Sequence, residues 1–215
     1  MLEADRIWKV LEQRHGKDRQ EAFRKAHVAI CGLGGLGSNI AVALARVGIG
    51  HLHLIDFDYV EVSNIHRQQY FLCQIGKSKV EALKNVITQI NPYIDIQLDC
   101  VQLTEENVSE ILKNDWIICE AFDQPEAKSM LVNSILEMKS NKYVVASSGM
   151  AGMEDANQIH TRKIMEKFYI CGDEKSDVQD GIGLTAARVM ICAGHQAHKV
   201  LQIIEKEEIE NDSKR

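Results

Sequence analysis

The chain has 215 residues, with 25 lysines and arginines against 31 aspartates and glutamates, and its formal net charge is −6. An acidic chain disfavours sequence-independent nucleic-acid binding, which needs clustered cations. No apolar run approaches the roughly 20 residues of a membrane helix, and residues 1–10 carry mixed charge without the apolar centre of a secretion signal. We therefore expect one cytoplasmic domain over residues 1–215, with no membrane or nucleic-acid partner.

Short apolar runs alternate with helix-like patterns along most of the chain. After a helical arm over residues 1–25, the pattern predicts strands at 27–31, 51–56, 94–101, 116–121 and 143–147, separated by helices at 38–47, 77–90, 105–113 and 125–138. Strands that alternate with helices require crossover connections, and these favour a mainly parallel sheet with helices on both faces. The predicted fold class is therefore α/β and Rossmann-like.

The alternation loosens after Gly149. Residues 157–163 predict one further strand, residues 172–183 a polar loop, and residues 184–207 a long helix. We expect the added strand to be antiparallel and the charged tail at 208–215 to fray.

The six cysteines include no C-x-x-C pair, so their spacing favours neither a zinc ribbon nor a redox pair, and no structural zinc is expected. Cys31 and Cys119 lie in apolar runs and are predicted to be buried. Cys171 lies in a stretch rich in glycine and aspartate, which predicts a loop.

A glycine-rich segment follows the first predicted strand and opens the next predicted helix, where residues 32–37 read GLGGLG. In that context Gly34 and Gly35 let backbone N–H groups approach a phosphate, and Gly37 lets the helix pack on the strand. Asp56 follows about 20 residues later, where a carboxylate can accept hydrogen bonds from ribose hydroxyls. Together these features predict an adenine-nucleotide site.

Polar residues that follow Asp56 distinguish between nucleotides. Asn64, Arg67 and Lys79 supply an amide and two cations, which suits a triphosphate whose pyrophosphate leaves. The alternative for the two cations is a solvated charged face. A nicotinamide-dependent oxidoreductase would also need a substrate domain, but the stretch after Cys100 is occupied mostly in completing the sheet.

Several motifs identify the chain as resembling the ThiF/MoeB/HesA family, relatives of ubiquitin-activating enzymes. They are GLGGLGS (32–38), GIGHLHLIDFDYVEVSNIHRQ (48–68), GKSKVEAL (76–83) and INP (90–92), with weaker similarity at EAFDQ (120–124) and VASSG (145–149). The short length and the missing C-x-x-C pairs are most similar to a compact ThiF-type subgroup of thiamin biosynthesis. The resemblance implies a nucleotide-binding core over 26–150 and a carrier-binding and crossover region, with the last helix, over 151–207.

The resemblance also implies roles for particular residues. ATP would be bound by the glycine loop and the segments after it, through Gly34, Gly35, Leu36, Gly37, Asp56, Asp58, Asn64, Arg67, Gln68 and Lys79. Arg67, Lys79 and Asp123 would be catalytic, with Asp123 holding Mg²⁺ through ATP. A second interpretation of Asp123 is a charge at the N-terminus of the next helix. Some family members add an arginine from a partner's N-terminal arm, where Arg14 is preferred over Arg19.

The activity implied is adenylation of the C-terminal carboxylate of a ThiS-like sulfur carrier by a homodimer, with pyrophosphate as the leaving group. A downstream sulfurtransferase or thiazole-forming enzyme would be a further partner, and Cys171 is a candidate thiol for linkage to the activated carrier. An unreactive cysteine is the alternative there. Two other functions stay open, an ATP-dependent dehydratase of a threonylcarbamoyl-modified tRNA adenosine and a non-catalytic carrier-binding relative. The net charge of −6 argues against the dehydratase, which would want a basic face.

Overall fold

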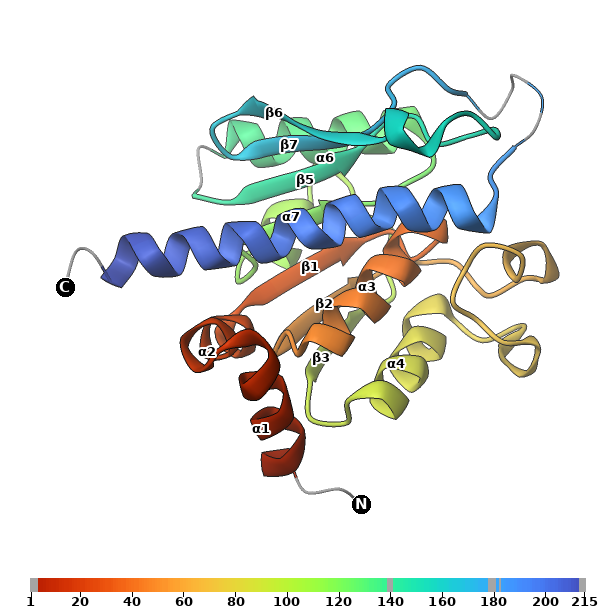
Figure 1. The fold of residues 1–215 in the computed structure, drawn as a ribbon. Coiled ribbons are helices and arrows are strands. Elements are labelled where there is room, and N and C mark those ends of the chain that lie inside the picture. The colour runs from red at the N-terminus through yellow and green to blue at the C-terminus, as the bar shows by residue number, and fades with distance from the viewer. Residues whose placement is uncertain (1–3, 139–140, 178–180, 182, 213–215) are drawn as a thin grey trace.

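A single seven-stranded sheet forms the centre of the protein (Figure 1). The computed structural model describes residues 4–138, 141–177, 181 and 183–212. The strand order is β3-β2-β1-β4-β5-β7-β6, and every pair is parallel except β6 with β7. The strands are β1 (His27–Cys31), β2 (His51–Ile55), β3 (Asp95–Asp99), β4 (Ile117–Glu120), β5 (Tyr143–Ser147), β6 (His160–Met165) and β7 (Phe168–Gly172). The predicted α/β class, with its antiparallel addition, is confirmed.

Helices cover both faces of the sheet, as predicted from the alternating pattern (Figure 1). They are α1 (Ala4–His15), α2 (Lys17–Lys25), α3 (Gly35–Val47), α4 (Lys79–Ile90), α5 (Val108–Ile111), α6 (Pro125–Glu137) and α7 (Ala186–Asp212), with short 3₁₀ turns η1 (Val62–Asn64), η2 (Leu72–Gln74) and η3 (Ala156–Gln158). Helices α2, α3, α4 and α7 pack on one face, and α5 and α6 pack on the other. Within the described ranges, no helix is both long and apolar enough to cross a bilayer.

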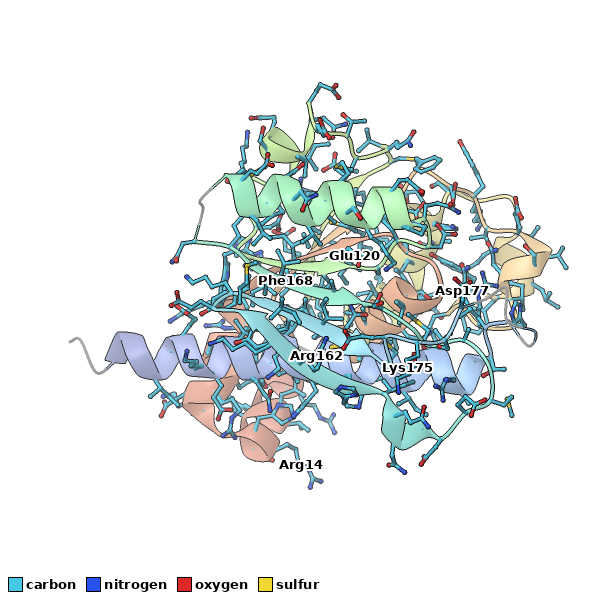
Figure 2. All side chains as sticks on the ribbon, turned by 90° about the horizontal axis from the view of Figure 1, so that it is seen from above. Arg14, Glu120, Arg162, Phe168, Lys175 and Asp177 are labelled. Carbon is cyan, nitrogen blue, oxygen red and sulfur yellow. The ribbon has the colours of Figure 1, made fainter. Side chains whose placement is uncertain are left out.

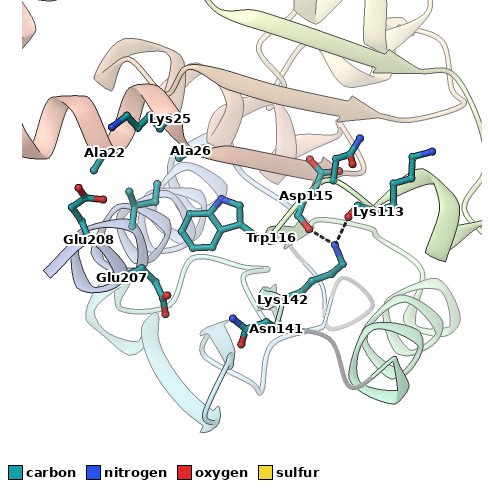
Figure 3. A pocket seen from close by; sticks show the side chains of 12 residues that line it. Ala22, Lys25, Ala26, Lys113, Asp115, Trp116, Asn141, Lys142, Glu207 and Glu208 are labelled. Atoms are coloured by element: carbon teal, nitrogen blue, oxygen red, sulfur yellow. Dashed lines mark hydrogen bonds between the residues drawn. The ribbon is translucent and has the colours of Figure 1, made fainter. Parts of the chain in front are cut away.

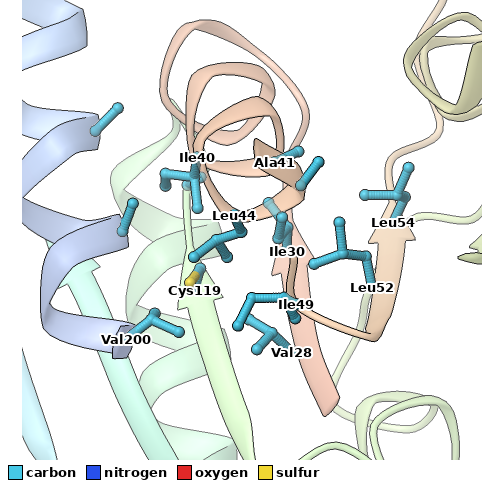
Figure 4. Close-up of a cluster of buried hydrophobic side chains, with 14 of the residues drawn as sticks. Val28, Ile30, Ile40, Ala41, Leu44, Ile49, Leu52, Leu54, Cys119 and Val200 are labelled. Atoms are coloured by element: carbon cyan, nitrogen blue, oxygen red, sulfur yellow. The ribbon is translucent and has the colours of Figure 1, made fainter. Parts of the chain in front are cut away.

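The larger core lies between the sheet and α3 (Figure 4). Ile30 and Leu52 point from adjacent parallel strands toward this side, and Ile40 and Leu44 of α3 lie one helical turn apart above them. All four side chains are buried. Val200 places α7 on the same core, so the last helix is part of the central packing.

Two predictions for the last third of the chain were wrong in detail. The single strand expected at 157–163 is instead a hairpin of β6 and β7, joined at Glu166 and Lys167. Neither joining residue is a glycine, asparagine or proline, so the usual turn signal was missing. The tail expected to fray from residue 208 continues α7 as far as Asp212.

The helix predicted at 105–113 is α-helical only over α5. The Asn107 side chain accepts the Thr104 N–H at 2.8 Å and donates to the Gln102 carbonyl at 2.9 Å. Such local side-chain bonds give the backbone an alternative to the helix, so the preceding residues form turns.

A buried histidine between two carboxylates stabilises the sheet on the side of β3. His53 of β2 is 3% exposed, with Nδ1 2.7 Å from Asp115 and Nε2 2.6 Å from Asp99. Burial alone would lower the pKa of His53. The hydrogen bonds and charges of Asp115 and Asp99 outweigh burial, so the pKa lies above its ordinary value of about 6.5.

This arrangement predicts that His53 contributes stability at low pH and loses that contribution as pH rises. A group whose folded-state pKa is raised stabilises fully below its unfolded pKa, about 6.5, and ceases to do so above its folded pKa. The difference in free energy of unfolding between the wild type and His53→Gln should therefore shrink from pH 6 toward pH 9, by at most about 1.4 kcal/mol per pH unit. Urea unfolding at several pH values measures it. A difference that grows with pH would contradict the prediction.

Candidate nucleotide-binding site

The predicted glycine loop lies where the sheet order reverses. After β1 the chain continues to β2 and β3 on one side, and β4 then returns to the other side of β1. In open α/β sheets, ligands bind outside the carboxyl ends of the strands at such a switch point. Gly32 has φ +90°, and a Cβ atom there would lie 2.8 Å from the Ala121 carbonyl oxygen. The glycine loop and the turn after β4 therefore touch at this edge.

The segment after η1 wraps over the start of α3. Asn39 Nδ2 donates to the Arg67 carbonyl at 3.3 Å, and Gln69 Nε2 donates to Asn39 Oδ1 at 2.6 Å. The Tyr70 hydroxyl donates to the Leu33 carbonyl at 2.8 Å, and Tyr70 is buried. These bonds bring Arg67 and its neighbour Gln68 to the glycine loop.

Two buried polar atoms beside the glycines have no protein hydrogen-bond partner, namely Arg67 Nε and Gln68 Oε1. The Arg67 stem lies 3.6 Å from the Cβ position at Gly35, and Gln68 Nε2 lies 3.7 Å from the Cβ position at Gly34. Buried polar groups are normally paired, and an exception needs an explanation. A phosphate held against the backbone N–H groups of the α3 N-terminus would satisfy Arg67.

An acidic pair holds the lysine of the site. Lys79, at the start of α4, is 7% exposed, and its Nζ lies 2.7 Å from Asp58 Oδ2 and 3.8 Å from Asp56 Oδ2. Asp56 accepts the N–H groups of Leu33 at 2.6 Å and Asp58 at 2.8 Å, which ties β2 to the glycine loop. Burial raises the pKa of Asp56, and Lys79 and the two N–H groups oppose that rise. Each Asp56 oxygen keeps a lone pair for a hydroxyl group.

The remaining residues predicted to contact ATP differ in the groups that they can present to it. The Asn64 side chain caps η1, because its Oδ1 accepts the Glu61 N–H at 3.0 Å, so its amide N–H groups are what it can donate to a ligand. Leu36 and Gly37 are buried, and the Leu36 side chain packs in the core. They therefore contribute backbone geometry. Asp123 is exposed in the turn between β4 and α6.

A single exposed carboxylate beside a phosphate site fits Mg²⁺. Magnesium is usually held by one or two carboxylates together with substrate phosphates and water, and not by an all-protein cage. Among the described residues, no group of three or more histidines, cysteines and acidic residues is arranged to bind a metal. The fit therefore depends on Asp123 and the phosphates together.

The structure does not bring one predicted residue, Arg14, to this edge. Arg14 is exposed at the end of α1 and projects outward at the edge of the molecule, away from Glu120 (Figure 2). Helix α1 packs near Gly48, at the C-terminal end of α3, whereas the glycine loop is at its N-terminal end. Arg14 is therefore remote from the glycine loop of its own chain.

The loop position predicted for Cys171 was wrong. Cys171 lies in β7, is fully buried, and contacts Thr161 Oγ1 at 3.3 Å. Burial raises the pKa of the Cys171 thiol to about 11, against weaker lowering by Thr161 and Lys199. A buried thiol that stays protonated is a poor nucleophile, so the unreactive alternative fits this placement better.

Sequence reasoning missed the residues that hold the site together. Glu120, Lys128 and Gln196 are buried or half-buried around the end of β4, and Gln196 Nε2 donates to the carbonyls of Glu120 and Val145 at 3.0 Å each. The sequence does carry one signal for this pair. Glu120 ends an apolar strand, and Lys128 follows eight residues later in a helix.

A cavity in the described part of the chain lies away from these residues, at the amino ends of β4 and β5 (Figure 3). It measures about 520 Å³, and Trp116, Lys25, Lys142 and Glu207 are among its lining residues. Nucleotide sites in parallel sheets lie at the opposite edge. The Lys142 ammonium there donates to the Leu112 carbonyl at 2.7 Å and also to Lys113 and Asp115, so the structure already uses it.

The fold and the switch-point geometry define a nucleotide-binding α/β domain. The ThiF family matches residues 9–215, and the chain therefore belongs to the ThiF family.

Known proteins are similar over much of the chain. The probable adenylyltransferase/sulfurtransferase MoeZ of Mycobacterium tuberculosis is 32% identical over 197 residues, 86% of this chain and 50% of that protein. The tRNA threonylcarbamoyladenosine dehydratase of Haemophilus influenzae is 35% identical over 158 residues, 69% of this chain and 59% of that protein. The molybdopterin-synthase adenylyltransferase of the same organism is 37% identical over 57% of this chain and 51% of its own length. The chain spans about half the length of these relatives.

A solved structure supports the fold. The E. coli tRNA N6-threonylcarbamoyladenosine dehydratase, in complex with ATP, superposes with a TM-score of 0.86 at 22% identity, covering 95% of this chain and 96% of that one.

Proposed function

We propose that this protein adenylates the C-terminal carboxylate of a ubiquitin-fold sulfur carrier of the ThiS type, using ATP and releasing pyrophosphate. The observation that carries the proposal is the convergence of Arg67, Lys79 and unsatisfied buried polar atoms on a glycine loop at the switch point. The names of relatives that are adenylyltransferases, and a neighbouring structure solved with ATP, support it.

The chemistry needs charge neutralisation more than proton transfer. An α-carboxyl group has a pKa of about 3.3–3.7, so the attacking carboxylate is ionised at neutral pH and needs no general base. It must approach a polyanionic triphosphate, and that repulsion is the main obstacle. Arg67 and Lys79 would neutralise phosphate oxygens, and Asp56 would accept the ribose hydroxyls. The carboxylate oxygen forms a bond to the α-phosphorus as the bond to the pyrophosphate oxygen breaks.

Asp123 is the residue that would hold Mg²⁺. The ion would supply additional neutralisation of the phosphates. Asp123 lies in the turn after β4, which meets Gly32 through Ala121, and this supports a position near the phosphates.

A homodimer would give Arg14 a role in the partner's site. The placement of Arg14 far from its own glycine loop supports a contribution to another subunit and not to its own. Large apolar side chains are also exposed on the segments that follow β2, and exposed apolar patches are typical of interaction surfaces. They are Phe57, Tyr59, Val62, Phe71, Leu72 and Ile75.

A sulfurtransferase or thiazole-forming enzyme would act after the activated carrier is formed, in the cytoplasm.

The test is carrier-dependent exchange of pyrophosphate into ATP, with a ThiS-type protein that ends in Gly-Gly. We expect exchange with the intact carrier and none with a carrier whose terminal carboxylate is amidated, because the amide removes the nucleophile. Tight ATP binding without exchange for any carrier would overturn the proposal.

The second candidate is an ATP-dependent dehydratase of threonylcarbamoyl-modified tRNA adenosine. The 35% identical dehydratase relative and the whole-length fold match favour keeping it. The net charge of −6 opposes it. ATP hydrolysis stimulated by the modified tRNA, in the absence of a carrier, would select this function over the first.

A further inference from the structure

A buried ion pair lies directly behind the turn that carries Asp123. Glu120, the last residue of β4, is 1% exposed, and its two carboxylate oxygens lie 2.9 and 3.0 Å from Lys128 Nζ. Lys128 is in α6, and its side chain is 23% exposed. Removing charges from water is costly, and such a pair often stabilises no more than apolar residues of the same shape would. Its presence at this edge therefore calls for another explanation.

The pair determines the path of the Asp123 turn. Glu120 Oε1 also accepts the Phe122 N–H at 2.8 Å, which fixes the residue next to Asp123. Lys128 Nζ reaches the Ser147 hydroxyl at 3.0 Å and the Ser147 carbonyl at 3.2 Å, so the turn is tied to the end of β5. The start of α6, the end of β4 and the end of β5 are thus held by one ammonium group.

We propose that Lys128 and Glu120 are positioning residues, which hold the Asp123 carboxylate where it can bind magnesium on the phosphates of ATP. The proposal rests on the proposed function. Asp123 itself is exposed, so its position depends on the backbone of the turn. The hydrogen bond from Phe122 to Glu120 fixes that backbone, and Lys128 fixes Glu120. Groups that orient a ligand residue in this way commonly change metal affinity by about 10- to 100-fold when they are lost.

Lys142 provides a matched control on the same sheet. Its ammonium donates to the carbonyls of Leu112, Lys113 and Asp115 at the amino end of β4, whereas Lys128 acts at the carboxyl end. Lys142→Met and Lys128→Met both remove a lysine that ties loops to strand ends. Only Lys128→Met should affect magnesium, because only that lysine holds the Asp123 turn.

The experiment measures the dissociation constant of ATP by calorimetry with and without Mg²⁺, without carrier or turnover. We expect Mg²⁺ to tighten ATP binding in the wild type and in Lys142→Met. Asp123→Ala should abolish that tightening, Lys128→Met should reduce it by about tenfold or more, and Lys128→Arg should restore most of it. Binding of ATP without Mg²⁺ should change little in Lys128→Met. Amide hydrogen exchange should show faster exchange at Phe122 in Lys128→Met, even without nucleotide.

Other results have distinct meanings. Full magnesium tightening in Lys128→Met, or equal loss in Lys142→Met, would overturn the positioning role while leaving the proposed function intact. A folded wild type that binds no ATP would overturn the proposed function instead. If Lys128→Met does not fold, Glu120→Met replaces it, because methionine has a similar length but gives the Phe122 N–H no carboxylate acceptor. Magnesium tightening that survives in a folded Glu120→Met would also overturn the proposal.

Discussion

Arg67→Ala should lower carrier-dependent pyrophosphate exchange by roughly 10²- to 10³-fold, because it removes the charge that meets the triphosphate. The wild-type Nε is buried beside Gly35 without a protein partner, so a phosphate oxygen is the group it can satisfy. The guanidinium Nη1 donates to the Ser63 carbonyl at 3.1 Å, which orients the side chain. Stability should change by only about 1 kcal/mol, since the two hydrogen bonds lost, to the Ser63 carbonyl and to His66 Nε2, are both exposed.

Two further variants make the Arg67 result specific. Arg67→Lys keeps the charge but loses the planar fork, so partial activity is expected. Arg162→Ala removes an exposed arginine of β6 that pairs with Glu174, and it should leave exchange unchanged. Exchange at the wild-type rate in Arg67→Ala, with ATP still required, would show that the phosphates lie elsewhere.

Gly37→Ala should be the most damaging small substitution at the site. A Cβ atom at this position would lie 1.8 Å from the Gly32 carbonyl oxygen and 2.9 Å from the Gly32 carbonyl carbon, both backbone atoms. Relief requires α3 to move away from β1, where the core is fully packed. We expect the free energy of unfolding to fall by about 3 kcal/mol or more. ATP binding should be lost as well. Thermal unfolding and ATP titration measure both.

Gly194→Ala is the matched control for that substitution. Gly194 is inside α7 with nothing within 4 Å of its Cβ position, so alanine should stabilise by about 0.5–1 kcal/mol. Equal effects of alanine at Gly37 and Gly194 would mean that the contact between α3 and β1 is looser than the packing indicates.

The periodic parts of the chain could be predicted from the sequence, and the irregular parts could not. The strands at 27–31 and 143–147 have the predicted bounds, because short apolar runs between turns have one favourable placement in a parallel sheet. The strand predicted at 157–163 overlaps β6, but the sequence does not predict β7, because no turn residue separates it from β6. The sequence predicts a loop at Cys171 because a stretch rich in glycine and aspartate follows it, although the preceding residues of β7 are apolar.

Some residues of the candidate site could likewise be predicted from the sequence, and others could not. Gly35, Asp56 and Lys79 have positions that follow from local sequence context, since each lies within three residues of the start or end of a predicted element. Glu120 and Lys128 could not be found in that way, because their roles depend on a contact between α6 and the ends of two strands. Periodicity describes which face of an element is buried, but it does not describe which polar groups meet inside.

The pairing of Lys79 with Asp58 has a consequence for which ligands can enter. Any anion that reaches Lys79 competes for the ammonium group with a carboxylate already 2.7 Å away, and Asp58, half exposed, can swing into water. A ligand gains from this exchange only if it brings more negative charge to the lysine than Asp58 does. We therefore expect the resting protein to select for ligands with several negative charges, such as a triphosphate, over a nucleoside. Once such a ligand departs, Asp58 would pair with Lys79 again and oppose its return.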